Sequence, residues 1–334
     1  MLLSKIAIPL FKHVVFYPQI KNTTRKLDFQ KEQIKENLYG HVKTLTAIPR
    51  FTKNIEGLYE AANYIQREWE EMKLQVEAQT YKGTDGDLNE YKNLIVSFGP
   101  PDAERIILGA HYDADSDTKT PGANDNASGT AGIIEVSRLL ASNNPKLSKR
   151  VDIVAFTNEE LPHCALDVKG DPRSVHEQYL TNRGSYHYAQ YLKRENLPVL
   201  GMLNLDMIGF YSDKPNSQKL PISALKLIYP TKANFIAVLG NLDSFDLVQK
   251  VKTGMKQNSS IKVRAFSMSP KVLPYIEDSD HRSFYLHGYQ AVMLNDTGGF
   301  RSSHQHKLTD LAETLDYEKM AEVVKGVYGT LIGL

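Results

Sequence analysis

Cysteine is nearly absent from this chain, and its scarcity excludes one way of stabilising the fold. Cys164 is the only cysteine among 334 residues, so no disulfide can form within the chain. A lack of disulfides fits a reducing compartment but does not require one. We therefore leave the localisation open, with the cytoplasm slightly favoured over export.

The chain also lacks an excess of charge and a long apolar run. Its 40 basic residues are balanced by 39 acidic ones, which gives no reason to expect nucleic acid or an anionic membrane as a partner. No run approaches the ~20 apolar residues that a transmembrane helix requires. We interpret residues 1–27 as a loosely attached arm, with a degenerate targeting segment or a surface anchor as alternatives. The oligomeric state stays open.

What the chain does contain is an alternation of strand-like and helix-like segments, with 41% apolar residues. Helical periodicity predicts helices at about 30–46, 56–73, 128–141, 184–195, 244–257 and 317–331. Apolar runs predict strands at about 74–80, 93–98, 106–110, 151–156, 202–205, 235–239, 261–266 and 291–294. This order predicts an α/β fold of three layers, αβα, around a mixed, largely parallel sheet. We expect a single domain over residues 28–334.

Four of these predicted strands are followed by side chains that can bind metal. The segments that follow them are His111-Tyr112-Asp113, Glu159-Glu160, Asp206, and Asn295-Asp296 with the loop that carries His304 and His306. Ligands bind beyond the carboxyl ends of the strands in open α/β sheets. Imidazoles and carboxylates gathered at that edge predict a metal site.

Two spacings suggest how such a site is organised. Asp113 lies two residues after His111, on the same side of an extended segment, and can accept the second ring N–H of the histidine. Asp125 precedes a predicted helix and could serve as its N-cap. However, Asn126 and Ser128 are also available as caps, so the two oxygens of Asp125 are free to bridge two cations.

The adjacent Glu159 and Glu160 can divide two tasks between them. Their side chains diverge at the end of a strand, so one can bind a metal while the other exchanges protons with a metal-bound water. Three further carboxylates, Asp115, Asp117 and Asp213, lie in loops and are expected to be surface charges. His304 and His306 are two residues apart, and either or both can be ligands.

Six ordered segments together resemble the M28 family of zinc aminopeptidases across most of residues 28–334. They are His111-Tyr112-Asp113, residues 122–129, residues 156–160, residues 204–209, residues 279–284, and His306 with Asp310. The resemblance implies a zinc-exopeptidase-like fold and two Zn²⁺ ions that share a carboxylate and a water, with Co²⁺ or Mn²⁺ as alternatives. It also implies peptide substrates with a free N-terminus.

The same resemblance implies a role for each residue. Asp125 would bridge the two ions. His111 and Asp206 would complete the coordination of one ion, and Glu160 and His306 that of the other. Glu159 would be the general base and Asp113 would orient His111.

The chain departs from the family pattern in a few places. Asn124 stands where the family often has an acid, and Gln305-His306-Lys307 replaces the usual Tyr-His-Thr. Alignment on Asp310 favours His306 over His304. The connection 161–183 is longer than the family norm and could cover the site. Asp280-His281 is interpreted as either substrate-side or structural.

Other functions remain open at this point. Glutaminyl cyclases resemble the family and carry out acyl transfer with a single zinc, and a carboxypeptidase or another amidohydrolase could use the same metal core. A non-catalytic binding domain would be expected to lack a ligand or the base, whereas every such position is filled here. Four aromatic residues are candidates for an apolar substrate pocket or for the core: Tyr211, Tyr275, Phe284 and Phe300.

Overall fold

The computed structural model describes residues 31–334 apart from 84–86, 88, 116, 161–179 and 222–228. Three expectations therefore lie outside the described residues: the N-terminal arm, Cys164, and a cover formed by residues 161–179. Among the residues described, no helix is long and apolar enough to cross a membrane. The single-domain boundary at residue 28 remains a prediction.

Eight strands form one sheet in the order β1-β2-β4-β3-β5-β8-β6-β7. The central pairs β3–β4, β3–β5 and β5–β8 are parallel, as is β6–β7, whereas three other pairs are antiparallel. The predicted mixed, largely parallel sheet is confirmed. The strands are β1 Glu77–Lys82, β2 Glu90–Phe98, β3 Arg105–His111, β4 Arg150–Phe156, β5 Val199–Leu205, β6 Phe235–Gly240, β7 Lys262–Ser267 and β8 Ala291–Asn295.

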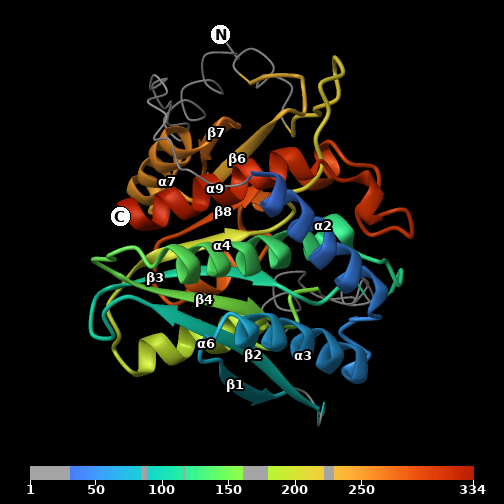
Figure 1. The fold of residues 1–334 in the computed structure, drawn as a ribbon. Coiled ribbons are helices and arrows are strands. Elements are labelled where there is room, and N and C mark those ends of the chain that lie inside the picture. The colour runs from blue at the N-terminus through green and yellow to red at the C-terminus, as the bar shows by residue number, and fades with distance from the viewer. Residues whose placement is uncertain (1–30, 84–86, 88, 116, 161–179, 222–228) are drawn as a thin grey trace.

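Helices cover both faces of the sheet, which confirms the three layers. Five helices in the described part of the chain pack on one face, and Figure 1 shows α4 and α9 of this group lying across the sheet. They are α2 Lys31–Ala47, α3 Ile55–Glu71, α4 Gly129–Asn143, α7 Phe245–Asn258 and α9 Tyr317–Gly333. The opposite face is covered by α6 Gly184–Arg194 and α8 His281–Leu286.

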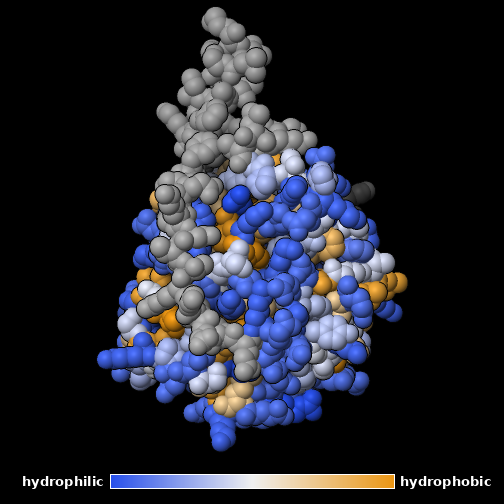
Figure 2. Space-filling view, turned by 45° about the horizontal axis from the view of Figure 1, so that its top comes forward, coloured by the Kyte–Doolittle hydropathy of each residue, from blue (hydrophilic) through white to orange (hydrophobic). Residues whose placement is uncertain are grey.

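The central strand β3 explains why its sequence is apolar throughout. Ile106 and Leu108 belong to the core on the α4 side, whereas Ile107 belongs to the core on the α6 side. A strand that is covered on both faces has no exposed positions, so polar residues appear only where it ends. The face shown in Figure 2 is in contrast mostly hydrophilic outside its grey residues, with hydrophobic residues in separate small patches.

Three predicted strands begin at other residues in the structure, and one short helix was not predicted. β2 begins at Glu90 and β5 at Val199, each three residues earlier than predicted. The strand predicted at 74–80 is β1, which begins at Glu77 because its register is set by pairing with β2, where Tyr81 faces Tyr91. β1 is an edge strand and largely exposed, so apolar alternation does not mark its ends. The short helix α8 was not predicted, since six residues are too few to show a helical period.

Candidate metal centre

The carboxyl ends of three neighbouring parallel strands meet at one edge of the sheet. β3 ends at His111, Asp206 follows β5, and Glu159 and Glu160 follow β4 three and four residues after Phe156. Because β3 pairs with both β4 and β5 in parallel, the three ends lie side by side. The topology therefore brings together four residues from three segments that are far apart in the sequence.

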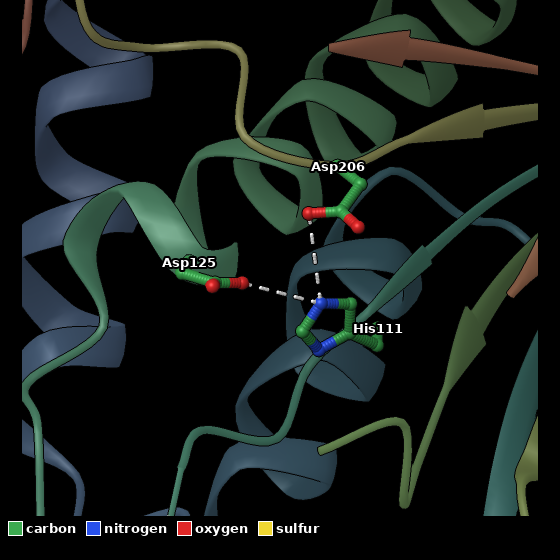
Figure 3. Close-up of side chains that lie close together, drawn as sticks. All are labelled: His111, Asp125 and Asp206. Atoms are coloured by element: carbon green, nitrogen blue, oxygen red, sulfur yellow. Dashed lines mark ion pairs between the residues drawn. The ribbon is translucent and has the colours of Figure 1, made fainter. Parts of the chain in front are cut away.

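His111, Asp125 and Asp206 form one group that can hold a metal ion. His111 Nε2 lies 3.5 Å from Oδ1 of Asp125 and 3.8 Å from Oδ1 of Asp206. All three residues are buried. Figure 3 shows that their side chains point toward one another from β3, from the loop before α4 and from the segment after β5. These are the three residues predicted for one of the two ions.

A second group lies on the other side of Asp125. His306 Nε2 is 3.2 Å from Oδ2 of Asp125 and 3.4 Å from Oε2 of Glu160. The two oxygens of Asp125 thus face different histidines, Oδ1 toward His111 and Oδ2 toward His306. A carboxylate in this arrangement can be shared by two cations. His304 is not part of this group, because its Nδ1 contacts Thr309 Oγ1 and its ring packs near Phe210.

Asp115 was expected on the surface, and that expectation is wrong. Its side chain is 1% exposed, and its Oδ2 lies 3.9 Å from Nδ1 of His306. Two backbone contacts draw its segment inward, a bridge between Ala114 and Phe51 and a hydrogen bond from the Ala114 amide to Arg50. The ligand atoms of Asp115, Glu160 and His306 also lie close enough to one another to hold a metal ion. Asp117 and Asp213 are exposed, as expected.

Each histidine of the centre has a carboxylate behind it. Asp113 Oδ1 is 3.5 Å from Nδ1 of His111, and Asp115 faces Nδ1 of His306 in the same way. In both cases Nε2 is the nitrogen that faces the centre. A carboxylate at Nδ1 fixes the tautomer and the ring orientation of a metal-binding histidine. The predicted contact of Asp113 with His111 is present, and Asp115 is its counterpart.

The loop that carries Asp125 is held by buried hydrogen bonds. The carboxylate of Asp310 accepts from the amides of Asn124 and Asp125 at 3.0–3.1 Å. Asn126 Oδ1 accepts from the Gly129 amide at the start of α4, and its Nδ2 donates to the Leu205 carbonyl at the end of β5. Asn126 therefore joins the start of α4 to the end of β5, and the Asp125 carboxylate does not cap the helix.

Asn124 joins the same loop to the segments that follow β8 and β5. Its Nδ2 donates to Asp296 at 3.0 Å, and its Oδ1 accepts from the Gly209 amide at 2.9 Å. The departure from the family at this position thus replaces a carboxylate with an amide that pairs with both a donor and an acceptor. Neither of these two contacts involves a candidate metal ligand.

Several polar atoms of the centre have no hydrogen-bond partner although they are buried. Within the described residues these include the ring nitrogen of His111 that faces the centre, Nε2, together with Oδ1 of Asp206 and Oε1 of Glu160. Buried polar atoms are rarely left unpaired. Imidazole nitrogens and carboxylate oxygens are the donors that zinc prefers. The residues present therefore fit a pair of bound divalent ions.

The charges in the centre lead to the same conclusion. Burial, together with the neighbouring Asp125, raises the pKa of Glu160 to about 7. Burial lowers the pKa of His306, but the carboxylates of Asp125 and Glu160 raise it to about 12. This excess of buried negative charge is stable only with a cation beside it. In the absence of metal, His306 supplies that charge by holding a proton.

Asp113 also contacts the backbone of the two glutamates, which its position in the sequence did not predict. Besides facing His111, its carboxylate accepts from the amides of Glu159, at 3.2 Å, and Glu160, at 2.9 Å. It thus connects the end of β3 to the two glutamates after β4. The same side chain orients one histidine and fixes the backbone of both acids.

The variant Asp113→Asn is expected to lower metal affinity or activity by about 10–100-fold. The amide nitrogen of the new residue would face a backbone N–H, so at least one of the three contacts is lost. Metal titration and steady-state rates measure the effect. Asp117→Asn is the control, since Asp117 is an exposed carboxylate nearby. Affinity and rate both within two-fold of wild type in Asp113→Asn would contradict this role.

An arginine that sequence reasoning missed also contacts the centre. Arg183 Nη2 lies 2.9 Å from Oε1 of Glu159, and both side chains are buried. It lies at the end of a long polar connection and 24 positions from its partner, so no local pattern in the sequence points to it.

A cavity of about 770 Å³ opens beside the metal centre. Asp206 and His306 line it, and the rest of the lining combines apolar side chains from β6, β7, β8 and neighbouring loops with polar ones such as Lys219, Arg264 and Arg301. Tyr275 and Phe300 belong to this wall, in agreement with one of the two expectations for the aromatics. Phe284 belongs to the core on the α6 side of the sheet, and Tyr211 packs against the core on the α4 side. The apolar lining includes Leu220, Phe235, Ala237, Leu239, Phe266, Leu273, Ile276 and Met293.

Comparison with known proteins places the site among metallopeptidases. Residues 93–331 match the model of peptidase family M28. The uncharacterized protein YfbL of Escherichia coli (strain K12) is 37% identical over 290 residues, which cover 85% of this chain and 83% of that protein. A probable leucine aminopeptidase of Trichophyton verrucosum is 24% identical, with coverage of 88% and 70%.

A probable zinc metalloprotease of Pyrenophora teres f. teres is 26% identical over 72% of this chain, which spans 50% of that protein. Among solved structures, LapB from Legionella pneumophila superimposes with a TM-score of 0.67 at 18% identity, covering 98% of this chain and 80% of LapB. A glutaminyl cyclase from Bacteroides thetaiotaomicron has a TM-score of 0.65 at 19% identity, covering 90% and 98%. These two similarities concern the fold.

Proposed function

The chain belongs to peptidase family M28 and is a metal-dependent exopeptidase, and we propose that it is an aminopeptidase that uses two zinc ions. The observation that carries the proposal is the position of Asp125, which presents one oxygen to each of two histidines. A cyclase with a single zinc would have no need for this shared carboxylate. Relatives named as zinc metalloprotease and leucine aminopeptidase support the choice of metal and of substrate end.

The proposed ligands divide into two sets around Asp125. His111 and Asp206 would hold one ion, and Glu160 and His306 the other. Asp115 faces Nδ1 of His306, the ring nitrogen that points away from the centre, so we assign it the orientation of that ring. Zinc, when bound in such a pair, lowers the pKa of water and stabilises negative charge on the scissile carbonyl.

Glu159 is the residue that would move the proton. Its Oε2 lies 3.9 Å from His111 Nε2, so one carboxylate oxygen faces the centre without belonging to either ligand group. In the proposed mechanism Glu159 accepts the proton of the attacking water and delivers it to the leaving amine. Burial raises the pKa of this carboxyl above its usual range.

The cavity beside the centre would hold the side chain of the first residue. Its wall is apolar over most of its area, so leucine-sized and aromatic side chains would be favoured over charged ones. Ala237 lies on β6, one strand away from Asn295 at the end of β8. Its small side chain leaves room in the middle of the sheet surface that lines the cavity.

The variant Ala237→Leu is expected to shrink the cavity and change the substrate preference. Because one methylene is worth about 10–200-fold in such pockets, kcat/KM for leucyl and phenylalanyl anilides should fall by at least about ten-fold. The alanyl anilide is the internal control, since its side chain needs little of the space. An equal loss for all three substrates would place the first side chain elsewhere.

A panel of substrates with and without added zinc tests the proposed function. We expect release of free amino acids from aminoacyl anilides and peptides, and none from their N-acetylated forms. Formation of pyroglutamate from N-terminal glutamine would instead support a cyclase, and release of the last residue would support a carboxypeptidase. Failure to turn over any of these substrates with zinc present would contradict an exopeptidase.

A further inference from the structure

Arg183 is held firmly against the end of β4, close to the proposed base. The amide of the next residue, Gly184, donates to the Thr157 carbonyl at 2.8 Å, and its own carbonyl accepts from Asn93 Nδ2 at 2.8 Å. A Cβ on Gly184 would lie 2.0 Å from Asn93 Oδ1, so only glycine permits this close approach. The backbone next to Arg183 is therefore fixed beside Thr157, which lies two residues before Glu159 in the chain.

The guanidinium of Arg183 contacts one oxygen of Glu159, and the other oxygen faces His111. Nη2 lies 2.9 Å from Oε1, while Oε2 faces His111 Nε2 at 3.9 Å. Arg183 and Glu159 are 3% and 7% exposed, so water has little access to compete for either group. Among the described residues, Nε and Nη1 of Arg183 have no hydrogen-bond partner, and Glu159 is its one ion-pair partner there.

The surroundings keep this arginine charged. Burial lowers its pKa, but the carboxylates of Glu159, Asp280 and Asp278 raise it above the usual value. A buried guanidinium with this much negative charge around it does not lose its proton. The contact with Glu159 is thus an ion pair between two buried side chains.

We propose that Arg183 is a positioning residue that holds Glu159 by one oxygen and keeps the other directed at the metal centre. The inference rests on the proposed function, in which Glu159 moves the proton. A free glutamate side chain rotates about three bonds and would face the centre only part of the time. Fixing one oxygen removes this freedom before the substrate binds, and misplacement by about 1 Å can lower a rate by about 10²-fold.

Replacement of Arg183 tests the proposal through kcat. Arg183→Met is expected to lower kcat by about 10–100-fold with KM and zinc content within about two-fold of wild type. Arg183→Lys should recover part of the loss, because it keeps the charge. Arg183→Gln keeps a donor without the charge and serves if the methionine variant does not fold. Arg105→Met is the matched control. Arg105 lies at the end of β3 away from the centre, is also buried, and forms an ion pair with Asp152.

Two further measurements separate positioning from a general structural effect. In a Glu159→Gln background, Arg183→Met should cost no more than about two-fold, since both changes act on one group. A crystal structure of metal-free Arg183→Met should show Glu159 in more than one rotamer, against one in the wild type. An unchanged kcat in folded Arg183→Met, a full additional loss in the double variant, or a single wild-type-like rotamer would overturn the proposal. Inactive wild-type enzyme on every substrate would instead reject the proposed function.

Discussion

Glu159→Gln is expected to lower kcat by about 10²–10⁴-fold, the range that general acid–base catalysis contributes. The amide has nearly the same shape as the carboxylate and can still place its oxygen beside Arg183, but it cannot take up a proton. The metal ligands are untouched, so the zinc content should not change. Rates on a leucyl anilide and elemental analysis of the purified protein measure the two quantities.

Glu160→Gln is the matched control for this experiment. It alters the adjacent residue, which faces His306 rather than His111. Loss of activity together with loss of metal is expected there, in contrast to loss of activity alone at Glu159. Normal turnover in metal-loaded Glu159→Gln would remove Glu159 from the proposed role.

Removal of divalent ions with a chelator is expected to abolish activity and to lower the unfolding temperature. Without a cation, burial and the Asp125 charge raise the pKa of Glu160 to about 7, which means that its ionised form is costly in the folded protein. An ion that binds only the folded chain at about 100 times its Kd adds about 2.7 kcal/mol to the free energy of unfolding. Calorimetry of the apo and zinc-loaded chain measures this difference.

The number of ions is the sharper part of this prediction. Titration of the apo protein should reach two zinc ions per chain, and Asp125→Asn should weaken both because the shared carboxylate has lost its charge. A stoichiometry of one in the wild type would favour the single-zinc alternative. Activity that survives complete removal of metal would reject metal-dependent hydrolysis altogether.

The sequence revealed those parts of the molecule whose cause is local. The helix predicted at 30–46 is α2 at Lys31–Ala47, because its apolar stripe faces the core directly. His111, Glu160 and Asp206 were found because polar residues directly after continuous apolar strands are conspicuous. The strand order then gathers them at one edge, as the general rule for parallel sheets requires. Their roles as ligands stay predictions until metal is measured.

The residues that escaped prediction depend on contacts between distant segments. Asp115 lies in a loop whose sequence resembles any exposed turn, but the structure buries it next to the bridge between Ala114 and Phe51. Arg183 meets Glu159 because Gly184 packs against Asn93 on β2, a contact between segments 91 residues apart. No periodicity or spacing encodes such a meeting, since it is a property of the packed fold.

The strand order has a consequence for how this enzyme can change over evolution. Three of the predicted ligands, His111, Glu160 and Asp206, lie at or after the ends of β3, β4 and β5, whereas most of the cavity wall comes from β6, β7, β8 and the loops that follow β7 and β8. Substitutions in one half of the sheet therefore leave the other half largely undisturbed. New substrate preferences can arise through substitutions of cavity residues on β6 and β7. Selection on the residues at the ends of β3, β4 and β5 meanwhile preserves the chemistry.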